Sequence, residues 1–148
     1  MKEQNRLRLE RLTVRFARRV AEKAAAREEE FVLAFADVRE RVLAPLMEEF
    51  AASLREAGHD ARVLPDSGPH APSVELSLGL AGGKASRNVV GFAVIRWKGY
   101  PLQVLAYLEA NPPPFDLVRF AHPFEIQADA AEQILIDAIE HLITCNAP

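Results

Sequence analysis

The chain has 148 residues but only one cysteine, Cys145, so it can form no disulfide within itself. It has no run of about 18 apolar residues, the length that a membrane-spanning helix requires. Arginine recurs through residues 1–20, where a secretory signal peptide would carry an uninterrupted apolar stretch. Only seven glycines and ten prolines accompany 49% hydrophobic residues, which excludes collagen-like and disordered chains. These absences predict one folded domain, with the cytoplasm as its expected location.

Motifs for catalysis and metal binding are also missing. The four histidines are isolated in the sequence and lack the His-x-x-x-His or Cys/His spacing that preorganises a metal site; they are His59, His70, His122 and His141. Residues 79–86 resemble a phosphate-binding loop, but Ala85 separates Lys84 from Ser86 and a strand, not a helix, is predicted to follow. A hairpin loop is the favoured interpretation of this segment. We therefore assign no catalytic, cofactor-binding or metal-ligating residues.

The formal net charge of −3 conceals a strong asymmetry along the chain. Residues 1–23 carry eight Lys/Arg and three Glu, a net charge of +5, whereas residues 24–60 carry four Arg and nine Asp/Glu, a net charge of −5. Residues 61–109 carry +2 and residues 110–148 carry −5. Charge asymmetry of this kind bears on association with partners and not on the fold.

The first 57 residues have the periodicity of α-helix. Apolar residues recur at spacings of three and four, with one longer step across the charged residues 27–30. This seam consists of Leu9, Leu12, Phe16, Val20, Ala24, Phe31, Phe35, Val38, Val42, Leu46, Phe50 and Leu54. Pro45 disrupts a helix interior but fits a first turn. We therefore expect a long helix that ends near Ala44, a shorter helix over residues 45–57, and Gly58 as its C-terminal cap.

The long helix is too long for a domain of this size to cover. About 40 residues at about 1.5 Å per residue extend roughly 60 Å, well beyond a compact domain of 148 residues. Either a second copy packs on residues 7–38 as a coiled coil or a swapped arm, or the chain breaks within residues 24–30 and folds back. We favour self-association, although the seam repeats slightly more slowly than a strict heptad.

After Gly58 the apolar residues recur with period two, which is typical of β-strands. Strands are expected over residues 61–64, 74–80, 88–97, 102–109 and 115–120, with Gly99 in a tight hairpin between the third and the fourth.

The closing segment is expected to form a helix capped by Asp129, with Glu132 as the capping-box partner. Cys145, in its last turn, is expected to serve as a small apolar filler. The predicted buried face consists of Ile134, Leu135, Ala138, Ile139, Leu142 and Ile143.

These elements predict an α+β fold with a long N-terminal helix broken near Pro45, an antiparallel meander of four to five strands, and a C-terminal helix packed on one sheet face. We divide the chain into residues 1–57, a helical arm and helix, and residues 58–148, the antiparallel sheet plus the C-terminal helix, within one domain overall. This order of elements is similar to that of small dimeric adaptor and secretion-chaperone-like domains of bacteria. The Ala- and Arg-rich composition also favours a bacterial source.

The strongest functional lead is the basic face of the N-terminal helix, to which Arg8, Arg11, Arg15, Arg18 and Arg19 contribute. An amphipathic basic helix can lie on phosphates, on anionic lipid, on an acidic partner protein, or on the acidic helices of its own chain. Trp97 and Tyr100 offer aromatic surface, and Phe115 belongs to a proline-rich loop over residues 111–116. That loop either presents a partner-binding surface or stops the strands from pairing further.

Three functions follow from these features. The first is a small non-enzymatic, self-associating protein-binding module, adaptor-like or chaperone-like, which forms a homo-oligomer and binds another protein. The second is a nucleic-acid-associated regulator that uses the basic helix, whereas a membrane partner is disfavoured. The third is an enzyme whose site is assembled from dispersed residues, for which a buried polar pocket containing His70 or His122 would be the distinguishing observation.

Overall fold

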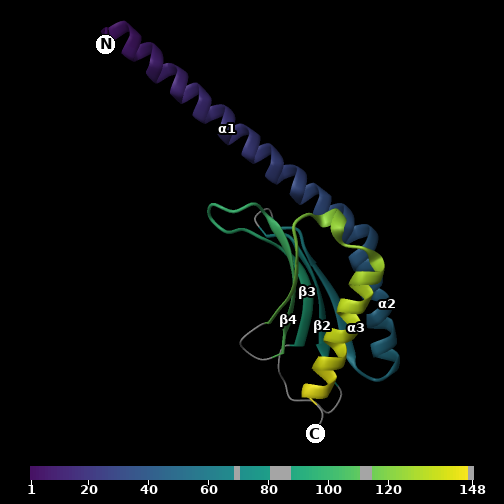
Figure 1. The fold of residues 1–148 in the computed structure, drawn as a ribbon. Coiled ribbons are helices and arrows are strands. Elements are labelled where there is room, and N and C mark those ends of the chain that lie inside the picture. Colours follow the sequence, from purple (N-terminus) through teal and green to yellow (C-terminus); the bar gives the residue numbers. More distant parts are fainter. Residues whose placement is uncertain (69–70, 81–87, 111–114, 147–148) are drawn as a thin grey trace.

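The computed structural model describes residues 1–68, 71–80, 88–110 and 115–146. It confirms the predicted α+β fold, in which a long N-terminal helix, an antiparallel sheet and a C-terminal helix follow in order (Figure 1). The helical elements are α1 (Glu3–Val38), a π-helical turn η1 (Arg39–Leu43), α2 (Ala44–Glu56), a short 3-10 turn η2 (Pro123–Glu125) and α3 (Ala128–Cys145). The strands are β1 (Asp60–Asp66), β2 (Ser73–Gly79), β3 (Asn88–Ile95), β4 (Gln103–Glu109) and β5 (Phe115–Phe120).

The five strands form one antiparallel meander in the order β1-β2-β3-β4-β5. Side chains alternate between its two faces, as period-two sequences require. Val74, Leu76 and Leu78 of β2 are buried, while the residues between them are only partly buried. Gly99 has a φ of +85°, which confirms its predicted left-handed conformation. The hairpin is wider than predicted, because β3 ends at Ile95 and β4 begins at Gln103.

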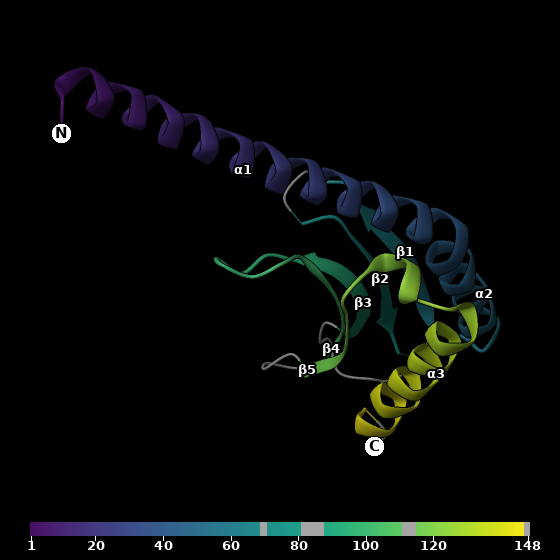
Figure 2. The ribbon, with the colours of Figure 1, turned by 45° about the horizontal axis from the view of Figure 1, so that its top comes forward.

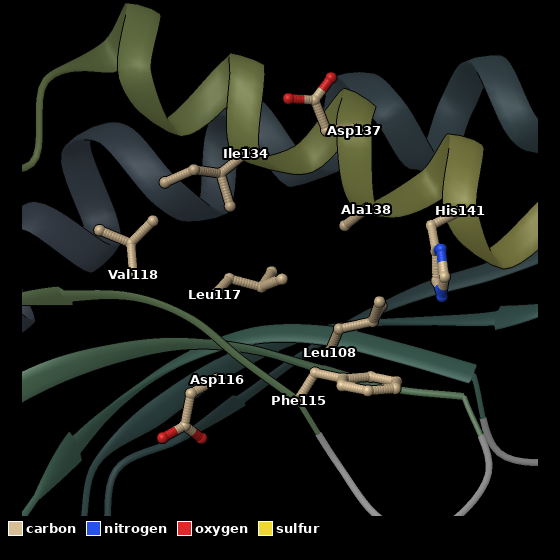
Figure 3. Close-up of a pocket in the computed structure, with 9 residues that line it drawn as sticks. All are labelled: Leu108, Phe115, Asp116, Leu117, Val118, Ile134, Asp137, Ala138 and His141. Atoms are coloured by element: carbon tan, nitrogen blue, oxygen red, sulfur yellow. The ribbon is translucent and has the colours of Figure 1, made fainter.

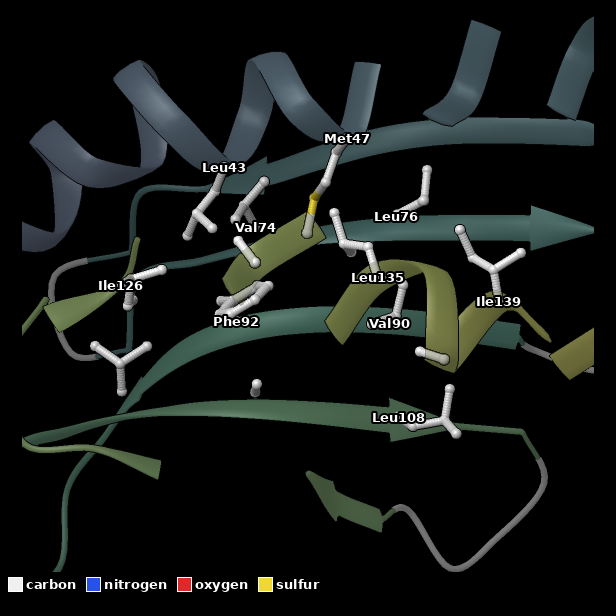
Figure 4. Packing of buried hydrophobic residues seen from close by; sticks show 14 of the residues in the cluster. Leu43, Met47, Val74, Leu76, Val90, Phe92, Leu108, Ile126, Leu135 and Ile139 are labelled. Atoms are coloured by element: carbon white, nitrogen blue, oxygen red, sulfur yellow. The ribbon is translucent and has the colours of Figure 1, made fainter. Parts of the chain in front are cut away.

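One face of the sheet carries the hydrophobic core, and the helices α2 and α3 cover it. Figure 4 shows Leu43 and Met47 pointing from the helical segment toward Val74 and Phe92, with Leu135 joining them from α3. All five side chains are fully buried. The core therefore draws on residues before and after Gly58, and it lies between helices and sheet as in other two-layer α+β folds.

The predicted apolar seam is wrong by one residue from Val42 to Phe50, whereas its last member, Leu54, is buried as predicted. The sequence placed Val42, Leu46 and Phe50 at its centre, but these residues are only partly buried. The fully buried positions are instead Leu43, Met47 and Ala51. The cause is η1, in which the backbone N–H of Ala44 donates to the carbonyl of Arg39, five residues earlier.

Pro45 explains where this wider turn lies. Its nitrogen carries no hydrogen, so it cannot donate to the carbonyl of Arg41, four residues earlier, as a regular helix would require. A single π turn of this kind adds one residue to the helix, and the buried positions Leu43, Met47 and Ala51 therefore each lie one residue later than predicted. The predicted break near Pro45 is thus confirmed, and its consequence for the register is the new finding.

The C-terminal end of α2 and the N-terminal end of α3 both have defined geometry. Gly58 has a φ of +94° and donates to the carbonyl of Arg55, while His59 donates to the carbonyl of Leu54. This is the Schellman arrangement, and it confirms the predicted cap. The predicted N-cap of α3 is wrong, because Gln127 occupies that position and makes no side-chain capping bond. Asp129 lies inside the first turn, where its carboxylate still favours the positive end of the helix dipole.

A buried arginine ties the helical segment to the sheet. Arg39 is only 7% exposed, and it donates to the carbonyl of Asp66 at 2.9 Å and to the hydroxyl of Ser67 at 3.1 Å. Its guanidinium also lies 5.9 Å from the ring centroid of Phe35. Because Asp66 ends β1 and Ser67 follows it, Arg39 fixes the end of α1 against one edge of the sheet.

Candidate interaction site

The first 30 residues of the chain project away from the body as part of one straight helix (Figures 1 and 2). Every residue in this range is exposed, and burial begins only at Phe31. We call residues 3–30 the arm. Because α1 is continuous from Glu3 to Val38, the alternative in which the chain breaks within residues 24–30 and folds back is wrong.

An apolar stripe runs along the arm. Leu9, Leu12, Phe16 and Val20 are 51%, 52%, 70% and 52% exposed. Their spacings of four and three continue, through Ala24, into the buried positions Phe31, Phe35 and Val38. Positions with these spacings share one helix face. The face that α1 buries in the hydrophobic core therefore extends several turns farther, where no described residue packs on it.

The five predicted arginines all lie on the arm. Arg8, Arg11, Arg15, Arg18 and Arg19 are exposed. None of them forms an ion pair with any residue in the described part of the chain, where the arm's own ion pair joins Arg6 to Glu3 at 3.7 Å. Shallow hollows border them, one between Arg11, Arg15 and Arg18 beside Leu7 and Val14, and another beside Phe16 and Arg19. The structure thus places apolar and cationic side chains on neighbouring faces of the arm.

Two contacts anchor the base of the arm to the body. Glu28 accepts a hydrogen bond from Arg96, which follows β3, with an N···O distance of 2.7 Å. The ring of Phe31 meets the ring of His122 edge-on, with 5.8 Å between centroids. Neither anchor reaches the apolar stripe, which ends at Val20, about two turns before Glu28.

Trp97 and Tyr100 lie together at the β3–β4 turn, as their proximity in sequence suggests. Their ring centroids are 6.4 Å apart in an edge-on arrangement. Arg119 of β5 places its guanidinium 4.6 Å from the centroid of Trp97 and pairs with Asp116 at 2.9 Å. Arg119 was not predicted as a site residue, because it is far from Trp97 in the sequence. It reaches this turn through the pairing of β4 with β5, in which Leu105 lies opposite Arg119. The cluster borders a hollow of about 300 Å³ that also includes Ile95, Pro101 and Gln103.

Phe115 lies elsewhere, on the sheet face that the helices cover. Its ring meets the ring of His141 of α3 edge-on, with 6.1 Å between centroids. Residues 111–114 of its predicted loop lie outside the described residues. The structure therefore separates Phe115 from Trp97 and Tyr100, with which the sequence had grouped it.

A groove of about 470 Å³ opens between β5 and α3, and Phe115 forms part of its wall (Figure 3). It exists because α3 packs over the centre of the sheet and leaves most of β5 uncovered, so that residues 115–119 are all exposed. The lining residues are Leu108, Phe115, Asp116, Leu117, Val118, Ile134, Asp137, Ala138 and His141. Sequence reasoning missed this groove, since no local pattern reports how far a helix extends across a sheet. The prediction that Ile143 is buried is also wrong, because that side chain is 40% exposed.

Cys145 is exposed and is not the apolar filler that we expected. Its sulfur lies 3.4 Å from Nε2 of His141. These residues are one helical turn apart, and any pair with that spacing on a helix meets in this way, so the contact alone assigns no chemistry.

His122 and His70 are the histidines that the sequence analysis named for a possible catalytic pocket. His122 is exposed, and its Nδ1 accepts from the backbone N–H of Phe124 at the start of η2. His70 lies outside the described residues. Within the described ranges, no group of three or more His, Cys, Asp or Glu side chains could hold a metal ion.

The sheet face away from the helices carries a polar bridge. The hydroxyl of Tyr107 on β4 donates to Glu75 on β2, and the tyrosine ring crosses the intervening strand at Gly91. A Cβ at Gly91 would lie 2.7 Å from the tyrosine ring, closer than such atoms approach. The glycine is therefore required for this bridge, which stiffens the centre of a face that no helix covers.

Among the described helices, none combines the length and the apolar character that crossing a membrane requires. Comparisons of this chain with protein-family models, with curated proteins and with solved structures give no match. The arm, the aromatic cluster and the groove are therefore the features of this chain that bear on its function.

Proposed function

We propose that this protein is a non-enzymatic, self-associating module that binds other proteins, and that the arm is its main contact surface. The observation that carries the proposal is the apolar stripe of Leu9, Leu12, Phe16 and Val20, which is 51–70% exposed yet continuous with a buried helix face. Exposed apolar surface of this extent marks an interaction site in soluble proteins. An adaptor-like or chaperone-like role in the cytoplasm fits this architecture.

The energetics favour association of two copies. Burying one Leu, Val or Phe side chain fully contributes about 1.5–3 kcal/mol, and a symmetrical pair would bury two stripes of four such residues. Association costs about 4–15 kcal/mol in lost freedom of motion. Because these side chains are 51–70% exposed, burial of both stripes would supply somewhat more than half of the full-burial value, an amount comparable with this cost.

A charge placed in the stripe should separate the copies. In the full chain, the double substitution Leu12→Glu and Phe16→Glu is expected to weaken self-association by about a hundredfold, because both carboxylates would have to be desolvated at the contact. Analytical ultracentrifugation across micromolar concentrations measures this change. Val14→Glu is the matched control, since Val14 is exposed and lies on the opposite face of the arm. A wild-type chain that stays monomeric at high micromolar concentration would contradict the proposal.

A specific observation also supports a nucleic-acid partner as the second candidate. The ion pair between Glu28 and Arg96 holds the β3–β4 turn near the base of the arm, so that Trp97 and the cationic side chains beside it accompany the five arm arginines. Proteins that bind single-stranded nucleic acids combine cationic side chains along the phosphate backbone with aromatic rings on which the bases stack.

The salt dependence of binding tests this second candidate. Replacing Arg8, Arg11, Arg15, Arg18 and Arg19 by glutamine is expected to flatten the salt dependence of single-stranded DNA binding, because each lost phosphate contact lowers the slope by about 0.7. Fluorescence anisotropy at several salt concentrations measures this slope. Binding that is equally tight and equally salt-dependent in the variant, or no binding by the wild type, would exclude the arm as a nucleic-acid surface.

A further inference from the structure

We propose that the groove between β5 and α3 receives the arm of a second copy of this chain, so that two copies exchange arms. This inference rests on the proposed function, and it adds the surface of the other copy against which the apolar stripe packs. It names one occupant, the segment from Leu9 to Val20 of the other copy.

The groove has the shape and lining for an amphipathic helix. Ile134 and Ala138 of α3 form one wall, and Leu108 and Phe115 of the sheet form the other (Figure 3). Phe115, Leu117 and Val118 are 50%, 38% and 38% exposed, so apolar surface is available there for burial. Apolar ridges with spacings of three and four commonly lie in grooves of this kind.

The arm of the same copy cannot reach this groove. The groove lies along the C-terminal half of α3, whereas the arm leaves the opposite end of the body and points away from it (Figures 1 and 2). Because α1 is one uninterrupted helix from Glu3 to Val38, no joint exists that would turn it back. The stripe and the groove can therefore meet only between two copies.

Charge favours the groove over a pairing of the two arms. The sequence of α3 contains Asp129, Glu132, Asp137 and Glu140 and no lysine or arginine. Residues 1–23 carry a net charge of +5 and residues 110–148 a net charge of −5. Two paired arms would place like charges together, whereas an arm beside α3 places opposite charges together.

Asp137 is the acidic side chain best placed to meet the arm. It projects from α3 at the rim of the groove, away from the sheet, and accepts a hydrogen bond from the amide of Gln133 at 2.8 Å (Figure 3). Arg15 and Arg19 are one turn apart on the arm and flank Phe16. With Phe16 in the groove, these arginines come to lie along the acidic helix.

Charge reversal tests the pairing. Asp137→Arg in the full chain is expected to weaken self-association by about tenfold or more. The new arginine would lie beside Arg15 and Arg19 of the other copy and repel them. Adding Arg15→Glu and Arg19→Glu to this variant is expected to restore most of the loss, while circular dichroism confirms that each variant is folded. Asp37→Arg is the matched control, since Asp37 is an exposed carboxylate outside the groove. Self-association that Asp137→Arg leaves unchanged would overturn the proposal.

The natural cysteine gives a second, independent test. Cys145 lies next to His141, which lines the groove, so an arm in the groove brings one end of its stripe close to this thiol. Under mild oxidation, either Leu9→Cys or Val20→Cys is expected to form a disulfide with Cys145 of the other copy, as peptide mapping would show. The wild type and Arg11→Cys, whose added thiol lies on the opposite face of the arm, set the background.

The outcomes separate this inference from the proposed function. If Leu12→Glu with Phe16→Glu leaves self-association intact, the proposed function itself fails. A different result would show that the two arms pair with each other. In that case the Leu12→Glu and Phe16→Glu variant dissociates but Asp137→Arg does not, and the disulfides join two added cysteines even when Cys145 is replaced by serine. That result would overturn arm exchange. Disulfides to Cys145 no more abundant than in Arg11→Cys would also overturn it.

Discussion

Replacing Phe35 by alanine is expected to lower the free energy of unfolding by about 3–5 kcal/mol, as for other fully buried phenylalanines. Phe35 has an exposed fraction of 0%, and it belongs to the hydrophobic core one turn after Phe31, where burial of α1 begins. Its removal leaves a cavity beside Arg39, whose guanidinium lies 5.9 Å from the ring centroid. Urea denaturation followed by circular dichroism measures the change.

Leu33→Ala provides the matched control for this prediction. Leu33 is two residues away on the same helix but is 63% exposed, so its truncation is expected to change the stability by no more than about 0.5 kcal/mol. Equal losses for the two variants would show that α1 does not dock through the Phe35 face.

Arg39→Met is expected to cost about 1.5–3 kcal/mol of stability, the usual contribution of hydrogen bonds made by a charged group. Methionine keeps the apolar stem but removes the hydrogen bonds that the buried guanidinium donates to the carbonyl of Asp66 and the hydroxyl of Ser67. The same denaturation experiment measures this loss.

The π-helical turn supplies the control for Arg39 as well. Arg41 lies in the same turn, but it is exposed and pairs with Asp37 one turn earlier at 3.1 Å. Exposed pairs of this kind contribute about 0.3–0.5 kcal/mol, so Arg41→Met is expected to have little effect. A loss for Arg41→Met as large as that for Arg39→Met would contradict the role assigned to the buried hydrogen bonds.

Local patterns were sufficient to predict most of the fold. Period-two segments gave the strands, Gly58 and Gly99 gave the cap and the hairpin, and Pro45 gave the break in the long helix. Each of these signals depends on a few neighbouring residues, because backbone conformation at a glycine or a proline is a local property.

What the sequence did not reveal depends on wider context. A proline can end a helix, kink it, or widen one turn, and only the third response moves the buried positions from Val42 and Leu46 to Leu43 and Met47. The lateral position of α3 on the sheet, which exposes Phe115 and Val118, follows from core packing between distant segments. The groove was therefore not predictable, whereas the exposed basic helix was.

The straightness of α1 has a mechanical consequence. Among the described residues, Glu28 pairs with Arg96 and Phe31 meets His122, and both contacts lie at the base of the arm, so the arm can tilt as a rigid rod about this base. At about 1.5 Å per residue, a tilt of about ten degrees at Phe31 carries the far end sideways through roughly 7 Å, more than half the diameter of a helix. Small changes around Arg96 and His122 can therefore change where the far end of the arm meets a partner.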